Sequence, residues 1–161
     1  METVLLLTTG GTLDKLYFDA LSEYQVGDPV APQILKQMNV NFDFEHQEIC
    51  RKDSLELTDD DREAMKQAIE ASSHRHVLIT HGTDTMVRSA QHIGDQAGKT
   101  VVFTGAMQPA AFTNTDAIFN IGCAVGALNV AAPGAYVAMS GQVYPADQVF
   151  KNYESRRFES K

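Results

Sequence analysis

Short apolar runs alternate along the chain with segments whose apolar residues recur at helical spacing. Four runs are continuously apolar, as in strands buried on both faces of a parallel sheet, and they cover residues 3–8, 76–80, 100–104 and 135–139. A looser alternation predicts a further strand over residues 41–49. Helices are predicted over residues 32–38, from Thr58 onward, over 85–97 and over 115–128. This order predicts one α/β domain with a doubly wound, mostly parallel sheet and helices on both faces, of the Rossmann-like or flavodoxin-like kind.

Two stretches between and after these elements carry no periodic signal. Residues 10–30 show no sustained period and are predicted to form a long loop, and loops of that length commonly act as functional lids. The charged tail over residues 151–161 is expected to lie on the surface or to be mobile. The helix over residues 85–97 is expected to end at Gly98, because glycine readily adopts the left-handed conformation found just past helix ends.

Composition excludes several classes of partner. The 161 residues are 43% hydrophobic, which suits one domain over residues 1–161. A net charge of −8 and a pI of about 5.0 argue against nucleic acid and anionic membranes. Glu2 stands where a signal peptide would be basic, and no apolar run approaches a membrane span, so we expect a cytoplasmic protein. Cys50, Cys123 and five histidines form no metal-ligand pattern, and we expect neither metal nor cofactor.

Two clusters of threonine and glycine follow two of the apolar runs. Residues 8–12 read Thr-Thr-Gly-Gly-Thr, and residues 80–85 read Thr-His-Gly-Thr-Asp-Thr. Both clusters then lie at carboxyl ends of strands, where open α/β sheets place their ligand crevices. Each cluster presents a hydroxyl beside glycine, with backbone N–H groups free to meet an oxyanion. The pair therefore favours acyl transfer by a threonine nucleophile.

Each cluster also has a plain structural interpretation. A Gly-Gly-Thr sequence is typical of a tight turn, and Asp84 or Thr85 is expected to cap the following helix. Capping and catalysis are compatible, and the functional interpretation depends on both clusters occurring together. Neither cluster is a nucleotide fingerprint, and the serine-hydrolase elbow is absent. His81 is expected to support its loop by hydrogen bonding rather than to act as a base.

The clusters resemble the two signatures of the bacterial-type L-asparaginase family. The resemblance extends to Tyr24, which stands where the family has its loop tyrosine, and to the segment that begins at Asp53 and Ser54. Residues 105–109 resemble the family's Gly-Ala-Met-Arg-Pro turn, with glutamine replacing arginine, and Lys151 falls where the family keeps its catalytic lysine. The motifs keep the family order between residues 4 and 151.

Family members typically carry a carboxyl-terminal domain, and in their tetramers this domain of a neighbouring subunit contributes to the active site. The present sequence stops where that domain would begin, so it is either a short form or a fragment, and the start at Met1 with the charged ending favours a short form. A short form has to complete its site in another way, and we expect a homo-oligomer, a dimer or a tetramer. Residues 143–144 and the helix around Gly122 are candidate contact surfaces.

The resemblance implies hydrolysis of L-asparagine to L-aspartate and ammonia through a β-aspartyl-threonine intermediate. It makes Thr12 the nucleophile and gives Tyr24 the task of taking or orienting its proton. Thr83, Asp84 and Lys151 form a second group that polarises Thr83 or handles a water proton. Both hydroxyls are expected to converge, so Thr83 is the alternative nucleophile.

The substrate contacts follow from the same resemblance. Asp84 is expected to accept the α-ammonium group of the substrate, and Ser54 with glycine-loop amides to hold its α-carboxylate. Asp53 either lies nearby or is only a turn residue. The complete expected substrate-binding set is Gly11, Asp53, Ser54, Gly82, Thr83, Asp84 and Ala106.

Three alternatives to an asparaginase stay open. The first is an amidohydrolase for another small linear amide, such as glutamine or a β-aspartyl or formyl derivative. The second is a non-catalytic domain that binds or senses amino acids. The third is a subunit that supplies ammonia to a larger amidotransferase.

Overall fold

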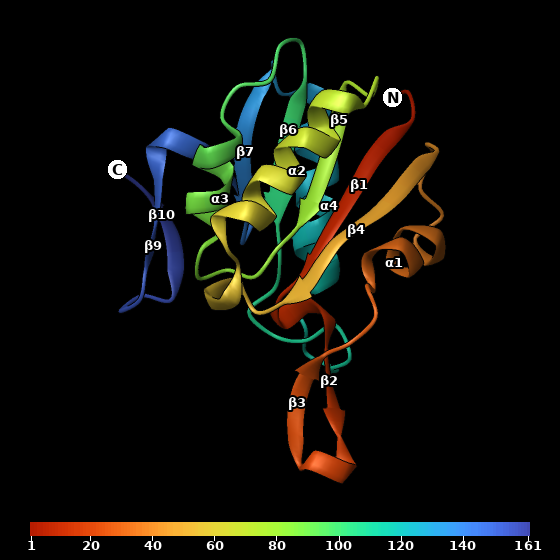
Figure 1. Cartoon of the computed structure of the whole chain (residues 1–161), viewed down its shortest axis with the longest axis vertical. Helices are drawn as coiled ribbons and strands as arrows, with labels where there is room; N and C mark the ends of the chain where they lie inside the picture. Colours follow the sequence, from red (N-terminus) through yellow and green to blue (C-terminus); the bar gives the residue numbers. More distant parts are fainter.

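A six-stranded sheet forms the centre of the molecule in the computed structural model, which describes residues 1–161 (Figure 1). Its strand order is β4-β1-β5-β6-β7-β8. The first five strands in this order are parallel, and β8 is antiparallel to β7. The strands are β1 (Val4–Gly10), β4 (Phe44–Lys52), β5 (His76–Thr80), β6 (Thr100–Thr104), β7 (Gly134–Met139) and β8 (Gln142–Pro145). The predicted fold class is confirmed.

Helices cover both faces of this sheet. The four helices are α1 (Ala31–Gln37), α2 (Asp59–Ala71), α3 (Met86–Ile93) and α4 (Ala117–Val130). Buried residues of α2 and α3 pack on one face with Leu5 and Leu7 of β1, whereas α1 and α4 pack on the other with Val4 and Leu6. Consecutive residues of β1 thus enter opposite cores, which explains why its apolar run is continuous.

The strand order places a topological switch point beside β1. From β1 the chain passes through α1 to β4 on one side, and then through α2 to β5 on the other side. The two crossover helices cover opposite faces of the sheet. In such sheets the ligand crevice lies outside the carboxyl ends of the two strands where the winding reverses. Here these are the ends of β1 and β5, from which the two threonine-glycine clusters continue.

The segment predicted as a long loop is a β-hairpin. The 3₁₀ turn η1 (Thr12–Asp14) leads into β2 (Lys15–Phe18), and β3 (Glu23–Val26) returns after the 3₁₀ turn η2 (Asp19–Leu21). Figure 1 shows this hairpin projecting beyond the carboxyl edge of the sheet. The prediction was wrong because most hairpin side chains are exposed, so no alternation of buried and exposed residues marks the strands.

The charged tail also forms a hairpin, from β9 (Val149–Asn152) and β10 (Arg157–Ser160). It follows the 3₁₀ turn η4 (Ala146–Gln148). Val149 and Phe158 bury their side chains in the core beneath α3, which fixes the hairpin to the domain. The prediction of a loose tail was wrong because these apolar residues are widely separated among charged ones.

Smaller corrections concern element ends and glycine packing. Strand β4 begins and ends three residues later than predicted. Helix α3 ends at Gly94, which has a φ of 58°, and not at Gly98. The glycines at positions 122 and 126 face open space, so the predicted close packing within this chain is wrong. No helix has the length and apolar content that a membrane crossing requires.

Asp14 closes the base of the projecting hairpin. Its backbone oxygen accepts a hydrogen bond from Gly27 at 2.8 Å, and its Oδ1 accepts one from Val30 N–H at 3.0 Å. Its Oδ2 is buried without a partner. Burial raises the pKa of this carboxyl to about 7, and the hydrogen bond from Val30 opposes this rise only in part. The folded protein therefore holds a proton on Asp14 that the unfolded chain releases near pH 4.

We expect Asp14→Asn to flatten the pH dependence of stability. The contribution of a protonated Asp14 is fully present below about pH 4 and is lost as the pH rises through about 7. Asparagine keeps the acceptor for Val30 and does not ionise. Relative to wild type, the variant should therefore gain at most about 4 kcal/mol between pH 4 and pH 8. Urea unfolding at both pH values measures this gain. Asp19→Asn, at the exposed hairpin tip, is the control, and an equal difference at both pH values would contradict the assignment.

Candidate active site

The two threonine-glycine clusters meet at the carboxyl edge of β1 and β5. These strands pair in register, with Thr8 opposite Thr80, and both chains turn outward just beyond. Gly11 has a φ of 84°, and a Cβ atom at this position would lie 2.5 Å from the Cα of Gly82. Only glycine permits this contact between backbones. Thr12 and Thr83 follow the two touching glycines, so both enter the crevice at the switch point.

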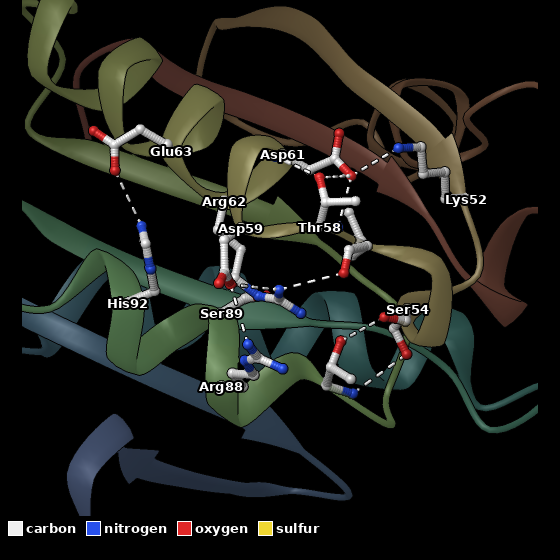
Figure 2. Close-up of polar contacts among 12 residues, drawn as sticks. Lys52, Ser54, Thr58, Asp59, Asp61, Arg62, Glu63, Arg88, Ser89 and His92 are labelled. Atoms are coloured by element: carbon white, nitrogen blue, oxygen red, sulfur yellow. Dashed lines mark hydrogen bonds and ion pairs between the residues drawn. The ribbon is translucent and has the colours of Figure 1, made fainter.

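Ser54 joins these clusters from the end of β4. It begins the 3₁₀ turn η3 (Ser54–Glu56) and is buried. A Cβ atom on Gly82 would lie 2.7 Å from the Cβ of Ser54. Thr85 donates its N–H to Ser54 Oγ at 3.3 Å and its hydroxyl to the Ser54 carbonyl at 2.7 Å. Figure 2 shows Ser54 held in these contacts at the end of the β4 ribbon.

Lys151 reaches the site from the hairpin β9–β10. Its Nζ donates to Thr83 Oγ1 at 2.8 Å and to Asp84 Oδ1 at 2.7 Å. Thr83 is buried, whereas the side chain of Asp84 is about a third exposed. The three side chains thus form a hydrogen-bonded group that leaves the other carboxylate oxygen of Asp84 open for a further cation.

Behind this group, a buried chain of hydrogen bonds supports the backbone of Gly82. The Nδ1 of His81 lies 2.7 Å from the Gly82 carbonyl, and its Nε2 lies 2.8 Å from Ser89 Oγ. Arg62 donates Nε–H to the same Ser89 oxygen at 2.9 Å, and both residues lie between α2 and α3 in Figure 2. Burial lowers the pKa of His81 to about 4, and the charge of Arg62 lowers it further. His81 is therefore neutral at pH 7, with Nδ1 donating and Nε2 accepting.

The expected supporting role of His81 agrees with this geometry, but sequence reasoning missed Arg62 and Ser89. Arg62 lies three residues before Met65 and seven before Ile69, on the buried face of α2. Thr58 begins that helix with a capping box that uses Asp61. An arginine at a core-facing helical position is the signal that could have identified the buried chain of hydrogen bonds.

Tyr24 lies farther out, on β3. Its ring packs 5.3 Å from that of Tyr17 and edge-on at 5.5 Å from that of Phe112, measured between centroids. Tyr24 is 50% exposed, and no hydrogen bond joins its hydroxyl to Thr12. The structure therefore places Tyr24 on a projecting hairpin next to the crevice, and its contact with Thr12 stays a prediction.

Two further expected site residues are already engaged. Asp53 forms an ion pair with Lys15 at 2.8 Å, which links the hairpin base to the end of β4. Ala106 is buried in the same core as Leu13, directly behind the first cluster. The structure thus assembles Gly11, Ser54, Gly82, Thr83, Asp84 and Lys151, and it places Asp53 and Ala106 in supporting positions.

The largest surface hollow, about 830 Å³, lies at the opposite edge of the sheet. It is lined by Glu45, Ser72 and His74 among others. Ser72 Oγ lies 2.6 Å from His74 Nδ1 and also accepts the backbone N–H of His74 at 3.0 Å. This is a local turn at the end of α2, and no oxyanion donors converge on it. Chemistry therefore points to the carboxyl edge despite the larger hollow.

Comparison with known proteins agrees with this choice. The model of the family described as asparaginase, N-terminal, matches residues 3–160. The chain belongs to the asparaginase family. One component of the glutamyl-tRNA(Gln) amidotransferase of Archaeoglobus fulgidus is 31% identical over 176 residues, which cover 98% of the present chain and 41% of that relative.

Solved structures of asparaginases share the fold. A probable cytoplasmic L-asparaginase from Campylobacter jejuni superposes with a TM-score of 0.86 at 27% identity, covering 99% of this chain and 54% of the other. The thermostable L-asparaginase from Thermococcus kodakarensis gives 0.82 at 24% identity, covering 98% and 51%, a likeness that shows the fold alone. The chain thus spans about half the length of the asparaginases it matches.

Proposed function

We propose that residues 1–161 form the catalytic domain of an L-asparaginase, which hydrolyses L-asparagine to L-aspartate and ammonia. The contact between Gly11 and Gly82 carries this proposal, because it brings Thr12 and Thr83 to one crevice. The hydrogen bonds from Lys151 to Thr83 and Asp84 support it further. Every step below uses side chains and backbone groups of this chain.

Thr12 is the proposed nucleophile. Its oxygen attacks the carbon of the substrate's side-chain amide, and the backbone N–H groups beside Gly11 and Thr83 stabilise the oxyanion. The threonine proton passes by way of Tyr24 to the amide nitrogen, which leaves as ammonia. An oxygen that accepts a hydrogen bond from an ammonium group is a weaker nucleophile, and Thr83 Oγ1 accepts one from Lys151. This contact favours Thr12 over Thr83.

Hydrolysis of the β-aspartyl ester completes the cycle. A water oxygen attacks the ester carbon, and the bond to Thr12 oxygen breaks. One water proton returns to the Thr12 oxygen through the group formed by Thr83, Asp84 and Lys151. Free aspartate leaves with its new carboxylate, and the enzyme regains its starting protonation.

Asp84 and Ser54 are proposed to recognise the amino-acid end of the substrate. Asp84 Oδ1 accepts Lys151, and Oδ2 is available for the α-ammonium group. Ser54 Oγ accepts a hydrogen bond from Thr85 and can donate its own proton to the α-carboxylate. Both contacts lie beside Gly82, and they favour a free α-amino acid as substrate.

The relative from Archaeoglobus favours a second candidate, in which the domain hydrolyses an amide to supply ammonia to a partner. Ammonia release from asparagine and glutamine, measured with gel filtration of the same sample, tests both candidates. We expect turnover of asparagine and discrimination of roughly 10- to 200-fold against glutamine, the usual effect of one methylene group. A preference for glutamine would favour the second candidate. Absence of ammonia release would favour a non-catalytic amino-acid-binding domain.

A cytoplasmic homo-oligomer, a dimer or a tetramer, remains part of the proposal. Helix α4 has no charged residue, and its open glycines at positions 122 and 126 lie near the exposed side chains of Phe119 and Val130. Uncharged apolar helix faces commonly pack against a partner. Gel filtration of the same sample reports the oligomeric state directly.

A further inference from the structure

Tyr153 contacts both members of the Lys151–Asp84 pair. Its hydroxyl donates to Asp84 Oδ1 at 3.3 Å, the same oxygen that accepts the hydrogen bond from Lys151. The Nζ of Lys151 lies 4.9 Å from the centroid of the Tyr153 ring, within the range of a cation–π interaction. One side chain therefore contacts the cation through its ring and the anion through its hydroxyl.

We propose that Tyr153 is a positioning residue that holds Lys151 and Asp84 in the geometry required for catalysis. This inference rests on the proposed function. The long, flexible side chain of lysine adopts many rotamers in solution. In this structure, Thr83 and Asp84 each accept one of its protons, and the Tyr153 ring lies against the ammonium group. The ring thus restricts the ammonium group on the side that the two acceptors leave open.

The hydroxyl of Tyr153 has a separate effect on Asp84. It adds a second donor to Oδ1, and this leaves Oδ2 as the carboxylate oxygen available for a substrate ammonium group. Burial and the nearby charge of Asp84 raise the pKa of Tyr153, so the phenol keeps its proton and remains a donor. The ring is thus linked to the chemical step through Lys151, and the hydroxyl is linked to substrate binding through Asp84.

The position of Tyr153 agrees with a functional role rather than a role in the core. Its side chain is 64% exposed, whereas Phe158 of the same hairpin is buried and holds β10 to the domain. The turn after Tyr153 is fixed by Asn152, whose Oδ1 accepts the backbone N–H of Glu154 at 2.9 Å. The hairpin is therefore held without Tyr153, and its side chain can be replaced without loss of core packing.

Two variants separate the ring from the hydroxyl. Tyr153→Phe keeps the ring and should raise KM for asparagine about threefold with kcat nearly unchanged. Tyr153→Leu removes both groups and should also lower kcat, by roughly two- to fivefold, the usual effect of an exposed cation–π contact. The melting temperature should stay the same. Phe150→Leu is the matched control, because Phe150 is exposed on the same strand and precedes Lys151, and it should change neither constant.

Acylation of Lys151 by acetic anhydride, followed by mass spectrometry, gives a readout that does not depend on activity. The Lys151 side chain is 13% exposed, and Tyr153→Leu should raise its labelling rate at least about threefold relative to Phe150→Leu. Unchanged labelling, or unchanged kcat and KM in an active enzyme, would overturn the role of Tyr153. Raised labelling together with a wild-type protein that releases no ammonia would instead overturn the proposed function.

Discussion

Replacing Thr12 with alanine is expected to lower asparagine hydrolysis by about 10³-fold or more while leaving the fold intact. The variant lacks the oxygen that forms the ester, so neither half of the proposed cycle can proceed. Thr12 is half-buried in η1, behind the glycine contact that shapes the crevice. Ammonia release measures the loss, and circular dichroism with the melting temperature checks the fold.

Thr12→Ser should retain measurable activity, because it keeps the hydroxyl. Thr113→Ala is a matched control, since Thr113 is an exposed threonine between β6 and α4. Full activity in Thr12→Ala would remove Thr12 from the mechanism. In that case Thr83 would be the remaining candidate for the nucleophile, and normal turnover by Thr83→Val would eliminate it as well.

Replacing Lys151 with methionine is expected to lower kcat by roughly 10²- to 10⁴-fold, the usual range for loss of a group that handles a proton. Methionine has a similar length but cannot donate to Thr83 or Asp84. The buried Thr83 hydroxyl would lose its only side-chain partner, and the charge of Asp84 would no longer be paired within the site. Steady-state kinetics with asparagine gives the size of the effect.

Two further variants interpret that result. Lys161→Met removes an exposed lysine at the end of the same hairpin and should leave kcat unchanged. Lys151→Arg keeps the charge but replaces a compact ammonium group by a planar fork, so it should restore little activity. If Lys151→Met kept more than about a tenth of the wild-type kcat, the group formed by Thr83, Asp84 and Lys151 would not take part in proton transfer.

The central sheet could be predicted from sequence because its strands are buried on both faces. In β1, Leu5 and Leu6 enter opposite cores, so the run is apolar at every position and is bounded by polar residues. The hairpin β2–β3 could not be predicted in this way. Its strands pair Tyr17 with Tyr24 outside the main sheet, and most of its side chains face solvent. Hydrophobic periodicity reports burial, and it fails where a strand has no buried face.

The site was predictable to different degrees. The clusters around Gly11 and Gly82 follow recognisable strands, and strand order alone brings them to one edge of the sheet. Lys151 comes from 68 residues beyond Thr83 on a hairpin outside the sheet, and only the family resemblance pointed to it. Tyr153 belongs to no motif, so its contact with Asp84 emerged only from the structure.

Trapping with hydroxylamine tests the acyl-enzyme on Thr12 most directly. Hydroxylamine competes with water for an ester intermediate, so the wild-type protein should convert asparagine partly to the β-hydroxamate of aspartate. Thr12→Ala should form none. Release of ammonia from asparagine without any hydroxamate, or hydroxamate formation by Thr12→Ala at the wild-type rate, would contradict a covalent intermediate on Thr12.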